Sequence, residues 1–556
     1  MARRVSTFKA QFTLVALAGV GALFAVAVAM AVAEPTSAQT DRSLGELRVE
    51  QPGTGVPGAL SSLQERAISQ GYLVPDQAAY ERAKDEAEAR AEQLSGESPS
   101  VASEALAPQK LRSWEGIRDP NVGPSDSTGA VGTSRYVELV NSKFAIYNRT
   151  NNDPLAQGTL NELAGESSSA FVFDPQVIWD PTTERFYYVM DDIISATDTR
   201  LAFGFSKDST PESGGDADWC KYTIPFGTRF PDYPKLGDTQ NRLLIGVNSF
   251  DSVTDAYLGS ELIALPKPPS GTTCPATLTP DVQPNLKNED GTDAFTPVPA
   301  NQTDSSTTGY IVARAGDLPD DYLTIFEATE DPTGVTLAPP ESLTVPTYGV
   351  PANAPQPGTK KRLDTLDARN TQAVSAIDPS RGTSGAVAIW TQHTVFGGFG
   401  AMVRWYEIDP NPSDPLADPT LFQSGTLSGS SGRYIFNGAV SPDRRVNGAT
   451  GQFGDSMVLG LNSSSKRRYP DIRTVSKIGA DPVSEKVLVK KSPVALKDFT
   501  CFPNPCRWGD YSAATPDPAA PTTGAHGQVW LTNQWVKKAG SRSAAGWGTW
   551  NWAASP

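Results

Sequence analysis

The pattern of apolar and polar residues divides this chain of 556 residues into three regions. Residues 12–33 form one uninterrupted apolar run, and residues 34–110 are mainly polar and charged. From residue 111 onward, short apolar runs of β-type residues are separated by turn clusters. Short strands with frequent turns predict an all-β structure, because a parallel sheet would need helical crossovers and no such pattern follows residue 111.

A repeated unit organises the third region. Each copy begins with a polar leader residue, continues through a turn, and ends in an apolar strand whose last residue is often Asn. The leaders of the six copies are Asp126, Asp174, Asp232, Asn370, Asn437 and Asp510. Strand material between residues 295 and 346 implies a seventh copy, so one unit spans about 63 residues, which is longer than a compact propeller blade.

These units predict a six- or seven-bladed β-propeller over residues 111–556, with tandem β-sandwiches as the alternative. The Trp-rich residues 547–552 are expected to form the last strand and to complete a blade with the N-terminal strand of the domain. The Asn at each strand end is expected to hydrogen-bond to the next loop.

The N-terminus has the pattern of an export signal. Arg3, Arg4 and Lys9 precede the apolar run, and Ala31-Val32-Ala33 supplies small residues for cleavage. Residues 1–33 therefore predict a signal peptide and a secreted, extracellular protein. The run is also long enough to span a bilayer, so an uncleaved N-terminal anchor and a cell-surface location are the alternative.

Residues 34–110 predict a helical segment with little apolar surface. Asp76 is a suitable N-cap for a helix over residues 77–94, and Lys84 with Glu88 is a charge pair at helical spacing. We expect a solvated stalk. A removable propeptide-like linker or a contact for the cell envelope is the functional alternative.

The four cysteines predict two disulfides in an exported chain. Cys501 and Cys506 bracket a short loop, which leaves Cys220 and Cys274 to pair with each other. The two histidines, His393 and His526, are too far apart for an HExxH zinc site. The net charge of −15 disfavours partners such as nucleic acid and anionic membrane surfaces.

Several segments, in the same order along the chain, resemble a family of large secreted bacterial β-propeller proteins with a sialidase-like fold. Most members of this family have no assigned activity. The segments include residues 126–132, 232–237, 469–473 and 507–511, and the resemblance covers roughly residues 114–552. It implies a propeller fold and extracellular use but no particular reaction. The Arg-Ile-Pro motif and the repeated Asp-boxes of true sialidases are absent from the sequence.

The leaders are the first candidate site. The first strand of each propeller blade lines the central channel, so Asp126, Asp174, Asp232 and Asp510, together with Asn370 and Asn437, could form a ring at one mouth. Carboxylate and amide oxygens suit Ca²⁺, which makes the four aspartates candidate metal ligands. The alternative is that each leader caps its own turn through backbone N–H groups.

Tyr233, Lys235, Arg473 and Tyr511 are the other polar candidates for ligand binding. If they face the same mouth, they would form a mixed-charge pocket for a sugar or a carboxylate. The alternative is that they are structural partners of the leading Asp residues.

The sequence favours a non-catalytic binding or scaffold module for cell-envelope, glycan or protein ligands. This module needs no cofactor but has Ca²⁺ as a candidate bound ion. The competing hypothesis is a glycan-cleaving hydrolase that uses channel-mouth carboxylates, with Tyr511 or Arg473 orienting the substrate. The sequence identifies no catalytic residue, and it predicts a membrane contact only if the N-terminal segment is retained.

Overall fold

The computed structural model describes residues 47–52, 73–94, 105–168, 170–269, 273–382, 385–411, 418–444, 453–519, 526–539 and 544–556. All of them belong to one compact unit, residues 46–556. The predicted signal peptide or anchor lies outside the described residues. Among the residues that are described, no helix is both long enough and apolar enough to span a membrane.

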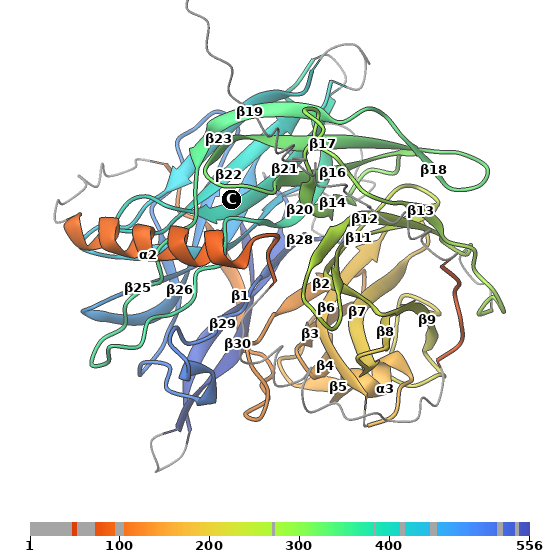
Figure 1. Cartoon of the computed structure of the whole chain (residues 1–556), viewed down its shortest axis with the longest axis horizontal. Helices are drawn as coiled ribbons and strands as arrows, with labels where there is room; N and C mark the ends of the chain where they lie inside the picture. Colours follow the sequence, from red (N-terminus) through yellow and green to blue (C-terminus); the bar gives the residue numbers. More distant parts are fainter. Residues whose placement is uncertain are drawn as a thin grey trace, which may run out of the picture. The chain divides into compact units, whose positions relative to one another are not determined.

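The described strands form the seven sheets of a β-propeller (Figure 1). Blade 1 contains β2 (Thr128–Val131), β3 (Arg135–Val140), β4 (Lys143–Asn148) and β5 (Pro154–Thr159). Blade 2 contains β6 (Phe171–Asp180), β7 (Arg185–Ser195), β8 (Asp198–Ser206) and β9 (Trp219–Gly227). Blade 3 contains β10 (Arg229–Asp238), β11 (Arg242–Asp251), β12 (Tyr257–Pro266) and β13 (Asp281–Gln283).

Blades 4 and 5 each have five strands. Blade 4 contains β14 (Ala294–Pro299), β16 (Thr308–Ala315), β17 (Asp320–Glu330) and β18 (Val335–Leu337), with β19 (Glu341–Tyr348) also paired to β17. Blade 5 contains β20 (Asn370–Asp378), β21 (Ala386–Val395), β22 (Met402–Asp409) and β23 (Thr420–Leu427), with β15 (Asn301–Gln302) parallel to β20.

Blade 6 contains β24 (Tyr434–Pro442), β25 (Met457–Ser465), β26 (Arg468–Lys477) and β27 (Val487–Lys491). Blade 7 contains β28 (Ala513–Pro516), β29 (Val529–Ala539), β30 (Ala544–Ser555) and β1 (Gln109–Glu115). The helical segments are α2 (Gln77–Gln93), α3 (Leu160–Ala164) and the 3₁₀ turn η1 (Phe499–Cys501).

The ring is closed by strands from the two ends of the domain. β1 pairs with β30, so that Trp114 lies opposite Asn551 in the sheet of blade 7. This confirms the predicted pairing of the Trp-rich last strand. The innermost strands β2, β6, β10, β14, β20, β24 and β28 each contact the next one around the ring.

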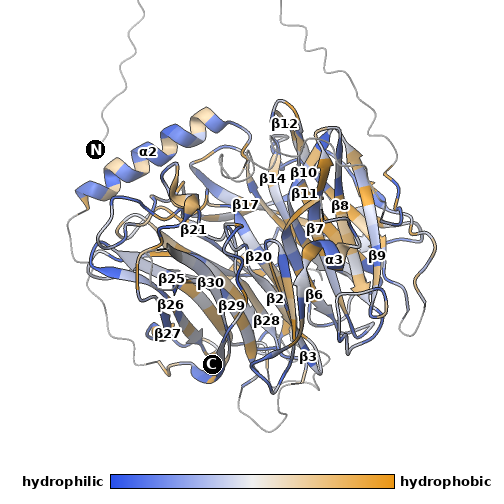
Figure 2. Ribbon diagram, turned by 90° about the horizontal axis from the view of Figure 1, so that it is seen from below, coloured by the Kyte–Doolittle hydropathy of each residue, from blue (hydrophilic) through white to orange (hydrophobic). Residues whose placement is uncertain are grey.

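The apolar core lies between neighbouring blades. One cluster joins Trp179 and Phe186 of blade 2 to Leu139 of blade 1, and another joins Leu459 of blade 6 to Trp390 of blade 5. Figure 2 shows the apolar residues concentrated along the strands, whereas α2 is largely hydrophilic. Burying both faces of each sheet in this way explains why the strands read as short apolar runs.

Most inner strands bend at a β-bulge close to their start. The pairing shifts between Phe173 and Gln176 in blade 2, and between Phe436 and Ala439 in blade 6. Asp174 and Asn437 lie at these bends with left-handed backbone, both at φ 49°. A bulge redirects side chains away from the directions that a regular strand allows. The leaders therefore belong to the channel and not to the hairpin turns.

The Asn residues that end the second strands connect one blade to the next. Asn141 Oδ1 accepts a hydrogen bond from the N–H of Asp174 at 2.8 Å, and Asn248 Oδ1 accepts one from the N–H of Thr296 at 2.8 Å. Asn533 Nδ2 donates to the carbonyl of Asn437 at 3.0 Å. The prediction of a bond to the next loop is therefore wrong in its partner, because these partners lie on the bulged inner strands β6, β14 and β24, and Asn533 bonds to the preceding blade.

The helix α2 is not a free stalk. Asp76 caps it as expected, because its Oδ1 accepts from the N–H of Ala79 at 2.8 Å. Ala87 and Ala91 are buried against the propeller in a cluster that includes Leu363. Small alanines let the helix approach closely, and a count of large apolar residues could not reveal this contact.

Both predicted disulfides are present. Cys220 is bonded to Cys274, and Cys501 is bonded to Cys506.

We expect Asn248→Ala to lower the free energy of unfolding by about 3 kcal/mol, because it leaves the buried N–H of Thr296 without an acceptor. Asn248 is fully buried and also bonds Ser260 and the hydroxyl of Thr296. Urea denaturation would measure the loss. The exposed Asn151→Ala is the control, and an equal effect of the two variants would contradict the proposed role of the strand-end Asn.

Candidate functional site

The leader ends of the inner strands meet in one buried group of charged side chains, which we call the channel cluster. It contains the predicted residues Asp126, Asp174, Asp232, Tyr233, Lys235, Asp510 and Tyr511. It also contains Asp191, Asp364, Asp367, Arg369 and Arg507. The structure therefore brings together seven of the eight residues that the sequence suggested.

Arg473 is the exception. It lies on β26, the third strand of blade 6, where Nη2 forms an ion pair with Asp471 at 3.0 Å. Nη1 of the same side chain donates to the carbonyl of Lys486 at 3.1 Å. Arg473 is thus a structural partner within its own blade, and it does not belong to the channel cluster.

Two of the leader carboxylates have complete structural partners. Asp126 accepts hydrogen bonds from the N–H of Asp510, at 2.7 Å, and from the side chain of Asn141. Asp510 accepts from Nη2 of Arg507 at 3.1 and 3.0 Å. These contacts join blade 7 to blade 1. Both leaders are therefore structural, but through a distant N–H and a guanidinium rather than by capping their own turns as the alternative supposed.

Asp191 breaks the pattern of the strand-end residues. It lies opposite Phe173, beside the bulge of blade 2, where blades 3 and 6 have Asn248 and Asn462. Asp191 is fully buried, and neither of its carboxylate oxygens has a hydrogen-bond partner in the described part of the chain. A buried, unpartnered carboxyl is costly, so this departure from a structural repeat marks a candidate functional group.

Lys235 is a buried cation in the same cluster as the Asp191 carboxyl. Its ammonium is buried and has no hydrogen-bond acceptor among the described residues. It lies between two aromatic rings, 3.8 Å from the centroid of Tyr233 and 3.5 Å from that of Tyr511. Cation–π contacts of this kind are worth about 2 kcal/mol when they are desolvated.

Burial controls the protonation of the cluster. It raises the pKa of Asp126, Asp174, Asp232 and Asp510 to about 7, and it lowers the pKa of Lys235 to about 7. Burial, with Asp174 and Asp232 nearby, raises the pKa of Asp191 well above its usual range. The cluster therefore exchanges protons near neutral pH, which is a property of many functional sites.

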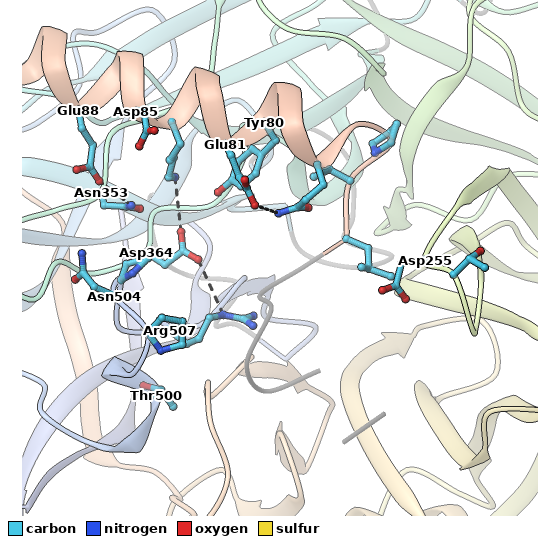
Figure 3. A pocket seen from close by; sticks show the side chains of 18 residues that line it. Tyr80, Glu81, Asp85, Glu88, Asp255, Asn353, Asp364, Thr500, Asn504 and Arg507 are labelled. Atoms are coloured by element: carbon cyan, nitrogen blue, oxygen red, sulfur yellow. Dashed lines mark hydrogen bonds and ion pairs between the residues drawn. The ribbon is translucent and has the colours of Figure 1, made fainter. Parts of the chain in front are cut away.

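A pocket of about 840 Å³ opens beside the cluster and beneath α2 (Figure 3). Arg507 connects the two, because it binds Asp510 of the cluster and lies 4.0 Å from Asp364 of the pocket wall. Lys84 of α2 reaches down to Asp364 from the opposite side, at 3.6 Å. The helix thus forms one wall of the pocket, and the channel mouth forms the other.

The lining of this pocket combines apolar residues (Leu73, Val74, Pro75, Pro503 and Pro505) with polar groups, and its charged groups are mainly acidic. Its carboxylates are Glu81, Asp85, Glu88, Asp255 and Asp364, and its cations are Lys84 and Arg507. Amide and hydroxyl groups come from Gln77, Tyr80, Thr254, Asn353, Thr500 and Asn504. Such groups can hold a ligand that offers many hydroxyls.

The calcium prediction finds no ready-made site. Within the described ranges, no three His, Cys, Asp or Glu side chains are placed to hold a metal ion. Asp126 and Asp510 are already bound to protein donors, and Asp232 lies 3.9 Å from Arg369. Calcium binding by the leaders remains a prediction.

Sequence reasoning missed five members of the cluster: Asp191, Asp364, Asp367, Arg369 and Arg507. Asp191 left a visible signal, because an Asp ends a strand where other copies have Asn. His393 occupies the equivalent place in blade 5, where its ring nitrogens contact the carbonyl of Ala368 and the hydroxyl of Tyr406. His393 is fully buried, and with both ring nitrogens bonded it has a structural role.

Comparisons with known proteins leave the family open. The sequence matches no known protein family and no curated protein. Similar solved structures include a mutant Synechocystis apocarotenoid oxygenase, with 9% identity, a TM-score of 0.35, and coverage of 66% of this chain and 72% of that one. They also include the phage phi92 endosialidase, with 7% identity, a TM-score of 0.36, and coverage of 79% and 68%.

A third similar structure is a subtype N11 neuraminidase-like protein of A/flat-faced bat/Peru/033/2010 (H18N11). It has 9% identity and a TM-score of 0.29 and covers 73% of this chain and 99% of that chain. Likenesses this distant support no argument about activity or ligand. The candidate site therefore has to be interpreted from its own residues.

The channel cluster should make the protein more stable at pH 5 than at pH 7. Burial makes five of its carboxyls bind protons more tightly when folded, those of Asp126, Asp174, Asp191, Asp232 and Asp510. Stability therefore falls as pH rises from about 4 to about 7, by up to about 1.4 kcal/mol per pH unit for each group. Asp367 does not interfere, because Arg369 and Arg314 outweigh burial and keep its pKa far below this window. Lys235 contributes only above pH 7, where its deprotonation in the folded state favours folding.

Asp174→Asn should reduce that pH dependence by about one proton, as measured by urea unfolding at pH 5, 6 and 7. The exposed Asp153→Asn, for which no such change is expected, is the control. If Asp174→Asn left the slope unchanged, Asp174 would be ionised throughout this range.

Proposed function

We propose that this protein is an extracellular β-propeller that binds a glycan in the pocket beneath α2. The observation that carries the proposal is the pocket itself, whose volume of about 840 Å³ lies within the range of small-molecule sites. Its wall of carboxylates, amides and hydroxyls matches the hydroxyl groups of a sugar.

The charged groups that line the pocket narrow the class of ligand that it can bind. Five carboxylates and two cations line the pocket, so it repels phosphates and other anionic ligands. The whole chain is also acidic, which disfavours nucleic acid and anionic membranes. Neutral or cationic sugars fit this field best, ahead of the other cell-envelope or protein ligands that the sequence left open.

The scaffold suits binding. The residues that line the pocket belong to α2, to the residues just before it and to loops that connect the strands of the ring. The closed ring fixes the ends of these loops, and sites supported by rigid elements lose little entropy when a ligand binds. Two disulfides fit an oxidising, extracellular location. Binding in this pocket requires no cofactor, and Ca²⁺ would act only as a stabilising ion.

Glycan cleavage is the second candidate function. It is favoured by Asp191 and Asp232, which each have a carboxylate oxygen without a hydrogen-bond partner in the described structure. Burial raises the pKa of Asp232 to about 7, so this carboxyl could act as a general acid. Neither residue lines the pocket, however, so a sugar held there would reach Asp364 and Arg507 before it reached these carboxyls.

The binding proposal predicts that pocket variants weaken glycan affinity. Isothermal titration with a panel of soluble oligosaccharides would identify a ligand, and Glu81→Ala and Asp85→Ala should each reduce its affinity about tenfold, the value of one lost hydrogen bond to a charged group. Glu86→Ala, on the same helix but outside the pocket, should bind normally. If no oligosaccharide binds, or if the three variants behave alike, the proposal is wrong.

Sugar release separates the two functions. A binding module should release no reducing ends from any oligosaccharide that it binds. Release by the native protein that Asp191→Asn abolishes, with affinity retained, would establish the hydrolase instead.

A further inference from the structure

The ammonium of Lys84 occupies a small, nearly enclosed site at the edge of the pocket. Its Nζ donates to the carbonyl of Leu366 at 2.7 Å and to Oγ1 of Thr365 at 3.3 Å, and it lies 3.6 Å from Oδ1 of Asp364. The side chain of Lys84 is only 10% exposed. Three oxygen acceptors around one nitrogen match the three N–H groups of an ammonium.

The acceptors are held in place by their own loop rather than by α2. Asp364 Oδ1 accepts from the N–H groups of Thr365, at 2.7 Å, and Leu366, at 3.1 Å. The N–H of Asp364 donates to the carbonyl of Cys506 at 3.0 Å, and the hydroxyl of Thr365 donates to the carbonyl of Ala352 at 3.1 Å. The oxygens would therefore keep this arrangement if Lys84 moved away.

One of the three acceptor residues has a strained backbone conformation. Leu366 has a φ of 68°, which is unfavourable for a side chain of this type. Backbone strain of this kind is often found at ligand-binding segments. Here it accompanies the carbonyl of Leu366 that binds the ammonium.

The surroundings select a cation with a single charged centre. Burial lowers the pKa of Lys84, while Asp364, Asp367 and Glu88 act in the opposite direction. The pocket beside it has more carboxylates than cations, and both Lys84 and Asp364 line it. Of the three acceptor residues, Asp364 lines the pocket and the buried Thr365 and Leu366 do not. A ligand in the pocket therefore reaches all three oxygens only when the Lys84 side chain moves aside, while α2 stays in place.

We propose that Asp364, Thr365 and Leu366 form an ammonium subsite, filled in this structure by Lys84, that takes the amino group of an amino sugar. This inference rests on the proposed glycan binding and names its ligand class. N-acetylation removes the charge and two of the three donors, so the subsite distinguishes glucosamine units from N-acetylglucosamine units.

The test compares tetramers of glucosamine and of N-acetylglucosamine by isothermal titration at pH 6 with the full chain. Lys84→Met keeps most of the apolar stem but removes the internal competitor, so it should bind the glucosamine tetramer about tenfold more tightly than the native protein does. The affinity for the N-acetylated tetramer should not change. Lys143→Met is the matched control, because Lys143 also lies 3.6 Å from a carboxylate, Asp119, but lies outside the pocket.

Two further variants test the acceptors. Asp364→Asn should weaken glucosamine binding about tenfold relative to N-acetylglucosamine binding. Asp364 also faces Arg507, so its substitution disturbs a second contact. Thr365→Val tests the acceptors without that disturbance, because it preserves side-chain volume and charge, and it should lower the affinity for glucosamine several-fold. Thermal unfolding would confirm that each variant is folded.

The outcomes are distinct. If Lys84→Met loses stability and gains no affinity, Lys84 is only an anchor for α2 and the subsite is wrong. Equal binding of both tetramers, unaffected by Lys84→Met, would overturn the subsite and leave glycan binding intact. If a lysine-containing peptide binds Lys84→Met and glucosamine does not, the amino-sugar class is wrong. If neither tetramer binds while neutral oligosaccharides of the panel do, only the subsite fails.

Discussion

The hydrogen bond from a strand-end Asn to the next blade is the interaction on which the rest of the structure depends. Closing seven sheets into a ring brings the inner strands together, and their bulges leave backbone N–H groups unpaired inside the protein. Asn141 and Asn248 satisfy the N–H groups of Asp174 and Thr296 in the following blades. The bulges and these bonds together fix where each leader side chain points.

The same constraint produces the candidate site. Where Asp191 replaces the Asn, a carboxyl takes the place of a group that both donates and accepts, and its oxygens have no described partner. Lys235 lies close by, held between Tyr233 and Tyr511 rather than by an oxygen acceptor. Two arginines offset these buried carboxylates. Arg369 lies 3.9 Å from Asp232, whereas Arg507 pairs with Asp510 and lies 4.0 Å from Asp364, a residue of the pocket beneath α2.

The helix α2 gives the channel mouth a second wall. It is held by small residues, Ala87 and Ala91, and by ion pairs such as Arg362 with Glu92 at 3.1 Å. A contact made of alanines and charges buries little apolar area, so it adds modest stability and leaves a polar space beside it. That space is the pocket in which a sugar, and an amino group replacing Lys84, would bind.

The sequence by itself determined the propeller, the disulfide pairs and most of the leaders, because turn residues, strand length and repeated Asp and Asn are local signals. Only the tertiary structure decided that Arg473 stays within blade 6 and that Arg369 and Arg507 join the leaders at the axis. It also decided that α2 packs on the mouth. Strand periodicity shows which residues share a face, but not which strand of a blade they occupy or which distant loops meet when the ring closes.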